Sequence, residues 1–209
     1  MDEIKIVFLH GLGQNAEVWT ETLSCIGKQD FLCIDLLDSE ENCFTYPCLM
    51  ERLESVVSKN DAELIIVGIS LGAVMAIDYY LRHRDKVKAL ILVAPQYKMP
   101  KLMLGIQNGI FRLLPESQFA KAGVSKEKMI SISASMKELD FSRQLNLITC
   151  PVYIVCGEKD FANKRAAHCL HEKLIASELT IINGVGHEVN VDAPEKLAEI
   201  ITKTYDNVS

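Results

Sequence analysis

The sequence predicts an α/β fold with a mostly parallel sheet of six strands, flanked by helices. Six short apolar segments recur, each bounded by turn residues: KIVFLHG, FLCIDLL, ELIIVGIS, KALILVAP, PVYIVCG and ELTIING. Their apolar residues are almost continuous rather than alternating, which is typical of strands buried on both faces of a parallel sheet. Helical patterns lie between most of them, and this alternation favours right-handed crossovers between parallel strands.

The helices follow from uninterrupted segments and from capping residues. Residues 73–83 predict a helix after the third strand, and residues 162–175 predict another after the fifth. The last helix is expected to start at Asp192, because Glu195 follows three residues later and Pro194 falls in the first turn, as in a capping box.

Residues 95–149 interrupt this alternation. They separate the fourth and fifth strands by far more chain than one crossover needs. Two sets of apolar residues in this segment follow helical spacing: Leu102, Ile106, Ile110 and Leu113, then Met129, Ile132 and Met136. Ser125 is placed to cap the second helix. The sequence therefore predicts a core formed by residues 1–94 and 150–209, and an inserted helical cap over residues 95–149.

Length and composition favour a soluble globular domain and exclude several classes of protein. The chain has 209 residues, 49% of them hydrophobic and 24% charged. A net charge of −6 argues against a nucleic-acid partner. No apolar stretch approaches the length needed to cross a membrane, and the first apolar segment is too short for a signal peptide. The seven cysteines are odd in number, and their spacing fits no disulfide framework or zinc site. We expect a cytoplasmic protein without a metal or cofactor, whereas the oligomeric state is not predicted.

The predicted cap differs from the core in charge. Residues 95–149 contain eight Lys or Arg and four Asp or Glu, so this segment carries +4 and the rest of the chain −10. A basic cap would attract acidic substrates. The alternative is an ordinary solvated helix face.

The segment VGISLGAVMA contains the pattern Gly68-Ile69-Ser70-Leu71-Gly72. It follows a predicted strand and opens a predicted helix, which is the context of a nucleophile elbow, where the serine has a strained conformation. Glycine is required on both sides because a Cβ there would collide with the tight turn. Ser70 would project at the C-terminal edge of the sheet, where ligands bind in open α/β folds. The alternative is an ordinary strand–turn–helix with a capping serine.

A nucleophilic serine needs a base to take its proton. His187 lies in the glycine-flanked loop NGVGHEVN after the last strand, at the same sheet edge as the serine. His83, His168 and His171 lie in charged or helical segments, and we expect them at the surface. His187 is therefore the candidate base.

The base in turn needs an acid to orient its ring. The segment GEKD ends the fifth strand and offers Glu158 and Asp160 at the same edge. The order serine, acid, histidine is the one associated with such an elbow. Glu188 adjoins His187 in sequence, but neighbouring side chains diverge, so Glu188 is not expected to orient the ring.

An oxyanion needs two N–H donors. The first is expected from Leu71, at the start of the helix that follows the serine. The second is expected from Leu12, in the loop HGLGQN after the first strand. Gly11 and Gly13 would permit close approach of a substrate to this loop. His10 ends the strand and is expected to shape the loop.

The same loop supports a different function. Gly11, Gly13 and Ala16 match the dinucleotide fingerprint G-x-G-x-x-A, and Asp35 ends the next predicted strand at a suitable distance to meet a ribose. This interpretation leaves the serine turn and the later acid and histidine without a role. Three loops that converge on one reaction are the stronger signal.

The segments HGLGQN, GISLGA, GEKD and GVGH occur in the order and spacing of the α/β-hydrolase family, which essentially the whole chain resembles. The resemblance implies that Ser70 is the nucleophile, Asp160 the acid and His187 the base, with Leu12 and Leu71 forming the oxyanion hole. It also implies an α/β-hydrolase fold lacking the family's first two strands. A serine at position 70, rather than an aspartate, argues against a dehalogenase-like or epoxide-hydrolase-like member.

The expected reaction is hydrolysis of a small-molecule carboxylic ester through an acyl-enzyme intermediate. The cap would select the substrate. Its first predicted helix, over residues 101–114, is apolar on more than one face, and Met103 and Phe111 are candidates for acyl-chain contact beside Gly11 and Gly13. Packing of this helix against the core remains an equal alternative. Small or medium apolar esters are the expected substrates, and a hydrolase-fold receptor with little turnover is the alternative function.

Overall fold

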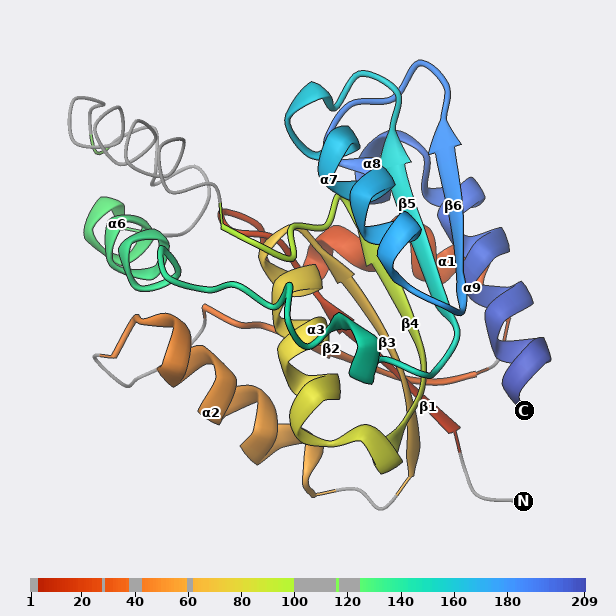
Figure 1. The fold of residues 1–209 in the computed structure, drawn as a ribbon, viewed down its shortest axis with the longest axis horizontal. Helices are drawn as coiled ribbons and strands as arrows, with labels where there is room; N and C mark the ends of the chain where they lie inside the picture. Colours follow the sequence, from red (N-terminus) through yellow and green to blue (C-terminus); the bar gives the residue numbers. More distant parts are fainter. Residues whose placement is uncertain (1–3, 28, 38–42, 60–61, 100–115, 117–124) are drawn as a thin grey trace.

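Six strands form one sheet: β1 Ile4–Leu9, β2 Asp30–Ile34, β3 Glu63–Ile69, β4 Val87–Val93, β5 Val152–Gly157 and β6 Ser177–Ile182. The computed structural model describes residues 4–27, 29–37, 43–59, 62–99, 116 and 125–209. The strand order is β2-β1-β3-β4-β5-β6, and all neighbours run parallel (Figure 1). Each strand coincides with a predicted apolar segment, so the parallel six-stranded sheet is confirmed.

The two edge strands differ from the prediction of uniform burial. In β2 only Ile34 is buried, and in β6 only Ile182 is buried. The four inner strands are buried along nearly their whole length. An edge strand has a neighbour on one side only, so less of its surface is covered. A short apolar segment does not reveal whether its strand will lie at the centre or the edge of the sheet.

Helices cover both faces of the sheet (Figure 1). On one face lie α2 Tyr46–Val57, α3 Leu71–Arg82 and α7 Phe161–Lys173. On the other lie α1 Thr20–Cys25, α8 Val189–Asp192 and α9 Pro194–Val208. The predicted helices over residues 73–83 and 162–175 are confirmed as α3 and α7. Three 3₁₀ turns join elements of the described chain: Ala16–Trp19, Arg84–Lys86 and Leu145–Leu147.

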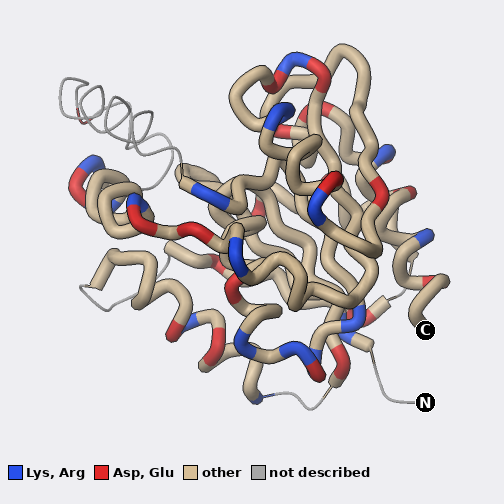
Figure 2. The backbone as a smooth tube through the Cα atoms, viewed as in Figure 1, with Lys and Arg blue, Asp and Glu red and all other residues tan. Residues whose placement is uncertain are grey.

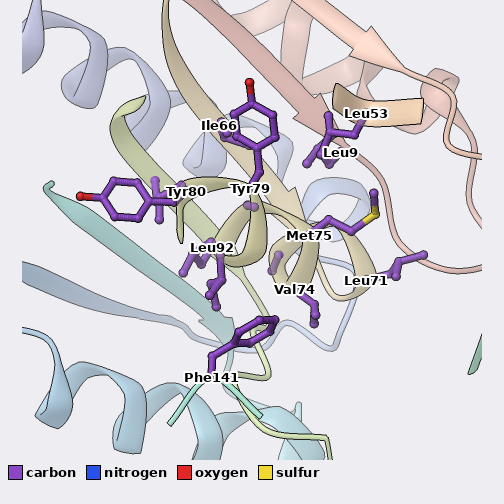
Figure 3. Packing of buried hydrophobic residues seen from close by; sticks show 14 of the residues in the cluster. Leu9, Leu53, Ile66, Leu71, Val74, Met75, Tyr79, Tyr80, Leu92 and Phe141 are labelled. Carbon is purple, nitrogen blue, oxygen red and sulfur yellow. The ribbon is translucent and has the colours of Figure 1, made fainter. Parts of the chain in front are cut away.

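Helix α3 is the most deeply buried helix that the structure describes. Every residue from 71 to 80 is buried. The helix packs on β1, β3 and β4 on one side, and on the other it meets α2 and side chains such as Phe141 (Figure 3). A helix whose residues are apolar on nearly every side must be covered on all sides. This burial gives the residue at its N-terminus a rigid position.

The predicted start of the last helix is wrong. Asp192 is the last residue of α8, and α9 begins at Pro194 with Ala193 as its N-cap and no side-chain capping bond. Proline fits the first position of a helix because it lacks the N–H that would otherwise remain unpaired. The Asp–Glu spacing satisfied the capping pattern, but the chain forms a separate short turn before the proline.

Helix α6 Lys126–Ser135 belongs to the predicted cap, and it lies beside α2 (Figure 1). The side chain of Ser125 accepts the Lys128 N–H at 3.3 Å, which confirms that Ser125 is the N-cap residue of this helix. The periodic residues Met129, Ile132 and Met136 are buried in the same hydrophobic cluster as α2 and α3. The first predicted cap helix, with Met103 and Phe111, lies outside the described residues, and the division into core and cap stays a prediction.

Charge is mixed in the described part of this segment. It contains five Lys or Arg and four Asp or Glu, and both signs occur on α6 and on the chain that follows it (Figure 2). The other three cations of residues 95–149 lie outside the described residues. The described part therefore gives little support to a strongly basic cap.

One expectation about the cysteines is wrong. Cys43 and Cys48, which flank the start of α2, form a disulfide with the sulfur atoms 1.96 Å apart. Cysteine count and spacing gave no sign of this pair, because a bridge across a helix start depends on where the turn places the two side chains. The other five cysteines are free. Among the described residues, no helix combines the length and apolar character needed to cross a membrane.

Candidate active site

Ser70 occupies a strained turn between β3 and α3. Its φ of 53° lies in the left-handed region, which a residue with a Cβ adopts at an energetic cost. Its N–H donates to the Val93 carbonyl at 2.9 Å, and its carbonyl accepts the Val74 N–H at 3.1 Å. These bonds tie the turn to β4 on one side and to the first turn of α3 on the other. The predicted tight strand–serine–helix turn is confirmed.

The two flanking glycines leave no room for a side chain. A Cβ at Gly68 would lie 2.3 Å from the Gly72 carbonyl oxygen. A Cβ at Gly72 would lie 2.1 Å from the Leu9 carbonyl oxygen. Both contacts are with backbone atoms, so neither is relieved by a change of rotamer. The predicted requirement for glycine at both positions is confirmed.

Asp160 and His187 meet at the same edge of the sheet. Nδ1 of His187 lies 2.7 Å from Oδ2 of Asp160. The aspartate side chain is 4% exposed and the imidazole is 43% exposed, so the pair has a buried acid and an accessible base. Asp160 is also the N-cap of α7, where its Oδ1 accepts the Asn163 N–H at 3.1 Å. One carboxylate therefore fixes both a helix start and an imidazole ring.

The pKa of Asp160 reflects these opposing influences. Burial raises it, because a charged carboxylate loses hydration. Hydrogen bonds from His187 and Asn163 stabilise the charged form and outweigh the burial, so the pKa of Asp160 lies below its usual value. The aspartate is ionised at neutral pH and accepts the Nδ1 proton of His187, which leaves Nε2 without a proton in the neutral ring.

The competing acids and histidines lie in other contacts. Glu158 Oε2 accepts the Gly184 N–H at 2.8 Å, and Glu188 Oε1 accepts the Gln14 side-chain N–H at 2.8 Å. His83 lies 3.4 Å from Glu54, and His171 pairs with Ser177. Of Glu158 and Asp160, only Asp160 contacts His187. In the described part of the chain, no hydrogen bond joins Ser70 to His187.

The loop after β1 places Leu12 near the same edge. Gln14 closes the loop, because its N–H donates to the Gly11 carbonyl at 3.2 Å and its Oε1 accepts the Gly11 N–H at 3.0 Å. Gly13 has a φ of 85°, and Met129 of α6 lies 3.5 Å from where its Cβ would be. The backbone N–H groups of Leu12 and Leu71 have no hydrogen-bond partner among the described residues. Both can therefore donate to an oxyanion.

The dinucleotide fingerprint has a different geometry here. Ala16 begins a 3₁₀ turn of four residues, and the helix that follows, α1, has only six. The Asp35 carboxylate accepts the Leu37 N–H at 3.2 Å and lies 3.4 Å from His10. The loop thus lacks the long helix whose N-terminus receives a pyrophosphate in that fold.

His10 shapes the loop from a fully buried position. Its Nε2 accepts the Leu36 N–H at 2.9 Å, so Nδ1 carries the proton and donates to the Gly11 carbonyl at 2.8 Å. Burial lowers the pKa of His10 below its usual value, although the Gly11 carbonyl and Asp35 act in the opposite direction. The ring is a neutral link between the ends of β1 and β2.

This link makes folding stability depend on pH. The unfolded chain binds a proton at His10 near the usual pKa of about 6.5, whereas the folded chain binds it only at lower pH. The contribution of the neutral His10 to the free energy of unfolding is therefore fully present above a pH of about 6.5. The free energy of unfolding should decrease as the pH falls below this value. In His10→Gln the amide can replace both hydrogen bonds but cannot titrate, so urea unfolding should lose this part of the pH dependence. The control His168→Gln changes an exposed histidine and should keep it, and equal pH dependence in all three proteins would contradict the assignment.

Three residues that support this region were not predicted from the sequence. Asn163 donates to Asp160, Gln96 donates to Asn163, and Gln14 joins the loop after β1 to the residue that follows His187. Position three of a helix with an aspartate N-cap is the only sequence signal that would have pointed to Asn163. No local pattern points to the glutamines, because their partners are distant in sequence.

A parallel sheet with a strained serine between strand and helix, and an Asp–His pair on later loops at the same edge, defines the class of α/β hydrolases. A model of the alpha/beta hydrolase family matches residues 6–200. The chain belongs to this family.

Curated relatives match the chain over different lengths. Probable lysophospholipase BODYGUARD 1 of Arabidopsis thaliana is 32% identical over 126 residues, covering 53% of this chain and 27% of that protein. Pimeloyl-(acyl-carrier protein) methyl ester esterase of Vibrio atlanticus is 29% identical, covering 62% of this chain and 53% of that protein. The chain thus spans about a quarter of the length of the first and half of the second.

Solved structures share the fold at low identity. An alpha/beta hydrolase enzyme from a Medee basin deep-sea metagenome library superposes with a TM-score of 0.85 at 19% identity, covering 98% of this chain and 90% of that one. A thermophilic esterase from Thermogutta terrifontis superposes with a TM-score of 0.83 at 16% identity, covering 99% and 91%. At this level of identity the match concerns the fold alone.

Proposed function

We propose that the protein hydrolyses carboxylic esters, with Ser70 as nucleophile, His187 as base and Asp160 as the acid that orients it. The observation that carries this proposal is the 2.7 Å contact between His187 and a buried, ionised Asp160, at the sheet edge where Ser70 has positive φ. Family membership and the ester-cleaving names of several relatives support the same reaction class.

The proposed reaction has two halves. Oγ of Ser70 bonds to the ester carbonyl carbon while Nε2 of His187 takes its proton, and the carbonyl oxygen accepts the N–H groups of Leu12 and Leu71. The C–O bond of the ester then breaks, and the leaving alcohol takes the proton from Nε2. Water repeats the sequence on the acyl-enzyme and releases the acid. The reaction needs Nε2 within hydrogen-bond reach of Oγ, a contact that often forms only when substrate binds.

The proposed substrates are small or medium apolar esters. Leu12, Leu71 and Met129 belong to one hydrophobic cluster, so the described surroundings of the proposed oxyanion hole are apolar. Gly11 and Gly13 are proposed to let the acyl group approach the loop. Met103 and Phe111 are proposed as further contacts of the acyl chain. A panel of p-nitrophenyl esters of increasing acyl length tests this choice, and we expect kcat/KM to fall for long chains.

Labelling with a fluorophosphonate tests the chemistry itself. We expect rapid, stoichiometric modification of Ser70, identified by peptide mass, because such probes react only with an activated serine. The labelling should be lost in Ser70→Ala and strongly slowed in His187→Gln. Absence of labelling would contradict the serine-hydrolase proposal. Rapid labelling without turnover of any ester in the panel would favour a ligand receptor over an esterase.

A further inference from the structure

Gln96 and the first turn of α7 form a hydrogen-bond chain that ends at the proposed acid. Nε2 of Gln96 lies 2.8 Å from Oδ1 of Asn163 and 3.5 Å from the Ala162 carbonyl oxygen. Nδ2 of Asn163 lies 3.0 and 2.9 Å from the two carboxylate oxygens of Asp160. The chain thus runs from the segment after β4, through α7, to the partner of His187.

The direction of each amide is fixed from both ends. The Ala162 carbonyl can only accept, so Gln96 presents its NH₂ group to α7, and Asn163 must present its oxygen to Gln96. The Asp160 carboxylate can also only accept, so it receives the NH₂ group of Asn163. His187 Nδ1 lies 3.1 Å from this NH₂ group, and both donate to the same carboxylate.

We propose that Gln96 and Asn163 are positioning residues that keep Asp160 ionised and aimed at Nδ1 of His187, a role that rests on the proposed function. Asp160 receives three N–H donors from two residues: the Asn163 backbone, the Asn163 side chain and the His187 ring. A carboxylate that accepts several N–H bonds is stabilised in its charged form.

The surroundings of Asp160 make these donors decisive. Among the described residues, His187 is its sole ion-pair partner. Lys164, one turn along α7, donates instead to the Glu158 carbonyl at 2.8 Å. The buried thiol of Cys156 has a pKa raised to about 12, mainly by burial, so it is neutral. A buried carboxylate without a permanent cation depends on hydrogen bonds for its charge.

The turn after β4 holds Gln96 in place. Ala94 has a φ of 48°, a left-handed conformation that costs free energy in a residue with a Cβ. Its N–H donates to the Val155 carbonyl at 2.8 Å, so the turn is tied to β5. The chain is thereby turned toward α7, and Gln96 follows two residues later. A strained turn here is explained if it serves to place the first amide of the chain.

Two substitutions test the role from opposite ends. Asn163→Leu removes the side-chain NH₂ group that donates to Asp160. The backbone N–H of residue 163 can still donate to the Asp160 carboxylate. Gln96→Glu has the same shape but can only accept, so it should draw the Asn163 NH₂ group away from Asp160. The control Gln144→Glu adds the same charge at an exposed residue whose side chain makes no hydrogen bond within the described chain. ¹³C NMR titration of the Asp160 carboxyl carbon is the first measurement, and kcat and KM on a p-nitrophenyl ester are the second.

We expect the Asp160 carboxyl to titrate at higher pH in Asn163→Leu and Gln96→Glu, and at the wild-type pH in Gln144→Glu. In the two test variants, kcat should fall roughly ten- to a hundredfold with little change in KM, as for loss of a hydrogen bond to a charged group. An unchanged titration in both variants would overturn the proposal, even if their thermal stability fell. A shifted titration in a protein that cleaves no ester would uphold the positioning role and refute the proposed function.

Discussion

Replacement of Ser70 by alanine is expected to lower kcat/KM on an activated ester by about four to six orders of magnitude. In the proposed site, the Ser70 hydroxyl is the group that forms the bond to the acyl carbon. The nucleophile, the base and the acid act as a unit, so loss of one removes most of the rate enhancement. His187 and Asp160 cannot compensate, because without Oγ the base has no proton to take. Initial rates on p-nitrophenyl butyrate, corrected for hydrolysis in buffer, measure the loss.

Two comparisons make this result specific. Ser58→Ala is the same change at an exposed serine at the end of α2, and it should leave the rate within about twofold of wild type. The Ser70→Ala protein should also keep its fold, because alanine meets the same backbone restriction at positive φ. Substantial activity in folded Ser70→Ala would refute the assignment of the nucleophile.

Replacement of Gly157 by alanine is expected to destabilise the protein by about 3 kcal/mol or more. The added Cβ would lie 2.0 Å from the Gly186 carbonyl oxygen and 2.6 Å from that of Val185. These are backbone atoms of the loop that carries His187, and this loop is bonded to the end of β5 through the Lys159 N–H. Relief of the clash must shift the loop of the proposed base relative to β5, so activity should fall with stability.

Gly186→Ala is the matched control on the other side of this contact. The closest atom to a Cβ at Gly186 is an Asp192 carboxylate oxygen at 3.6 Å, an ordinary contact distance. Urea unfolding should therefore show a change of under about 1 kcal/mol for Gly186→Ala. Equal destabilisation by the two substitutions would contradict the close approach of the two loops.

The sheet could be predicted from the sequence because each strand is a short apolar segment between turn residues. The uninterrupted segments over residues 73–83 and 162–175 likewise predicted α3 and α7, and the periodic apolar residues from Met129 to Met136 predicted α6. The start of α9 could not be predicted correctly, since Asp192 and Glu195 satisfied a capping pattern that the chain does not use. The Cys43–Cys48 bridge was missed because it depends on the conformation of one turn.

The candidate site likewise contains residues that the sequence predicted and residues that it did not. Ser70 was predicted from the glycines two residues away, and His187 from a loop that follows a strand. The turn after β5 offered both Glu158 and Asp160, and the choice of Asp160 rested on the resemblance to the family. The serine, the histidine and the pair of acids are local signals at a sheet edge. Gln96 was not found, since its partner Asn163 is 67 positions away in sequence. Hydrogen bonds between side chains that are distant in sequence produce no periodicity or spacing. The hydrogen bonds that support Asp160 could therefore not be predicted from the sequence.

Among the residues that the structure describes, two with side chains, Ser70 and Ala94, have positive φ, and they lie at the ends of the neighbouring strands β3 and β4. Each conformation costs about 1–2 kcal/mol that glycine would avoid. In directed evolution, a screen that rewarded only thermal tolerance would therefore favour glycine at both positions. At position 70 such a screen would select a variant that lacks the proposed nucleophile. Variants of this protein should be screened for thermal tolerance and turnover together.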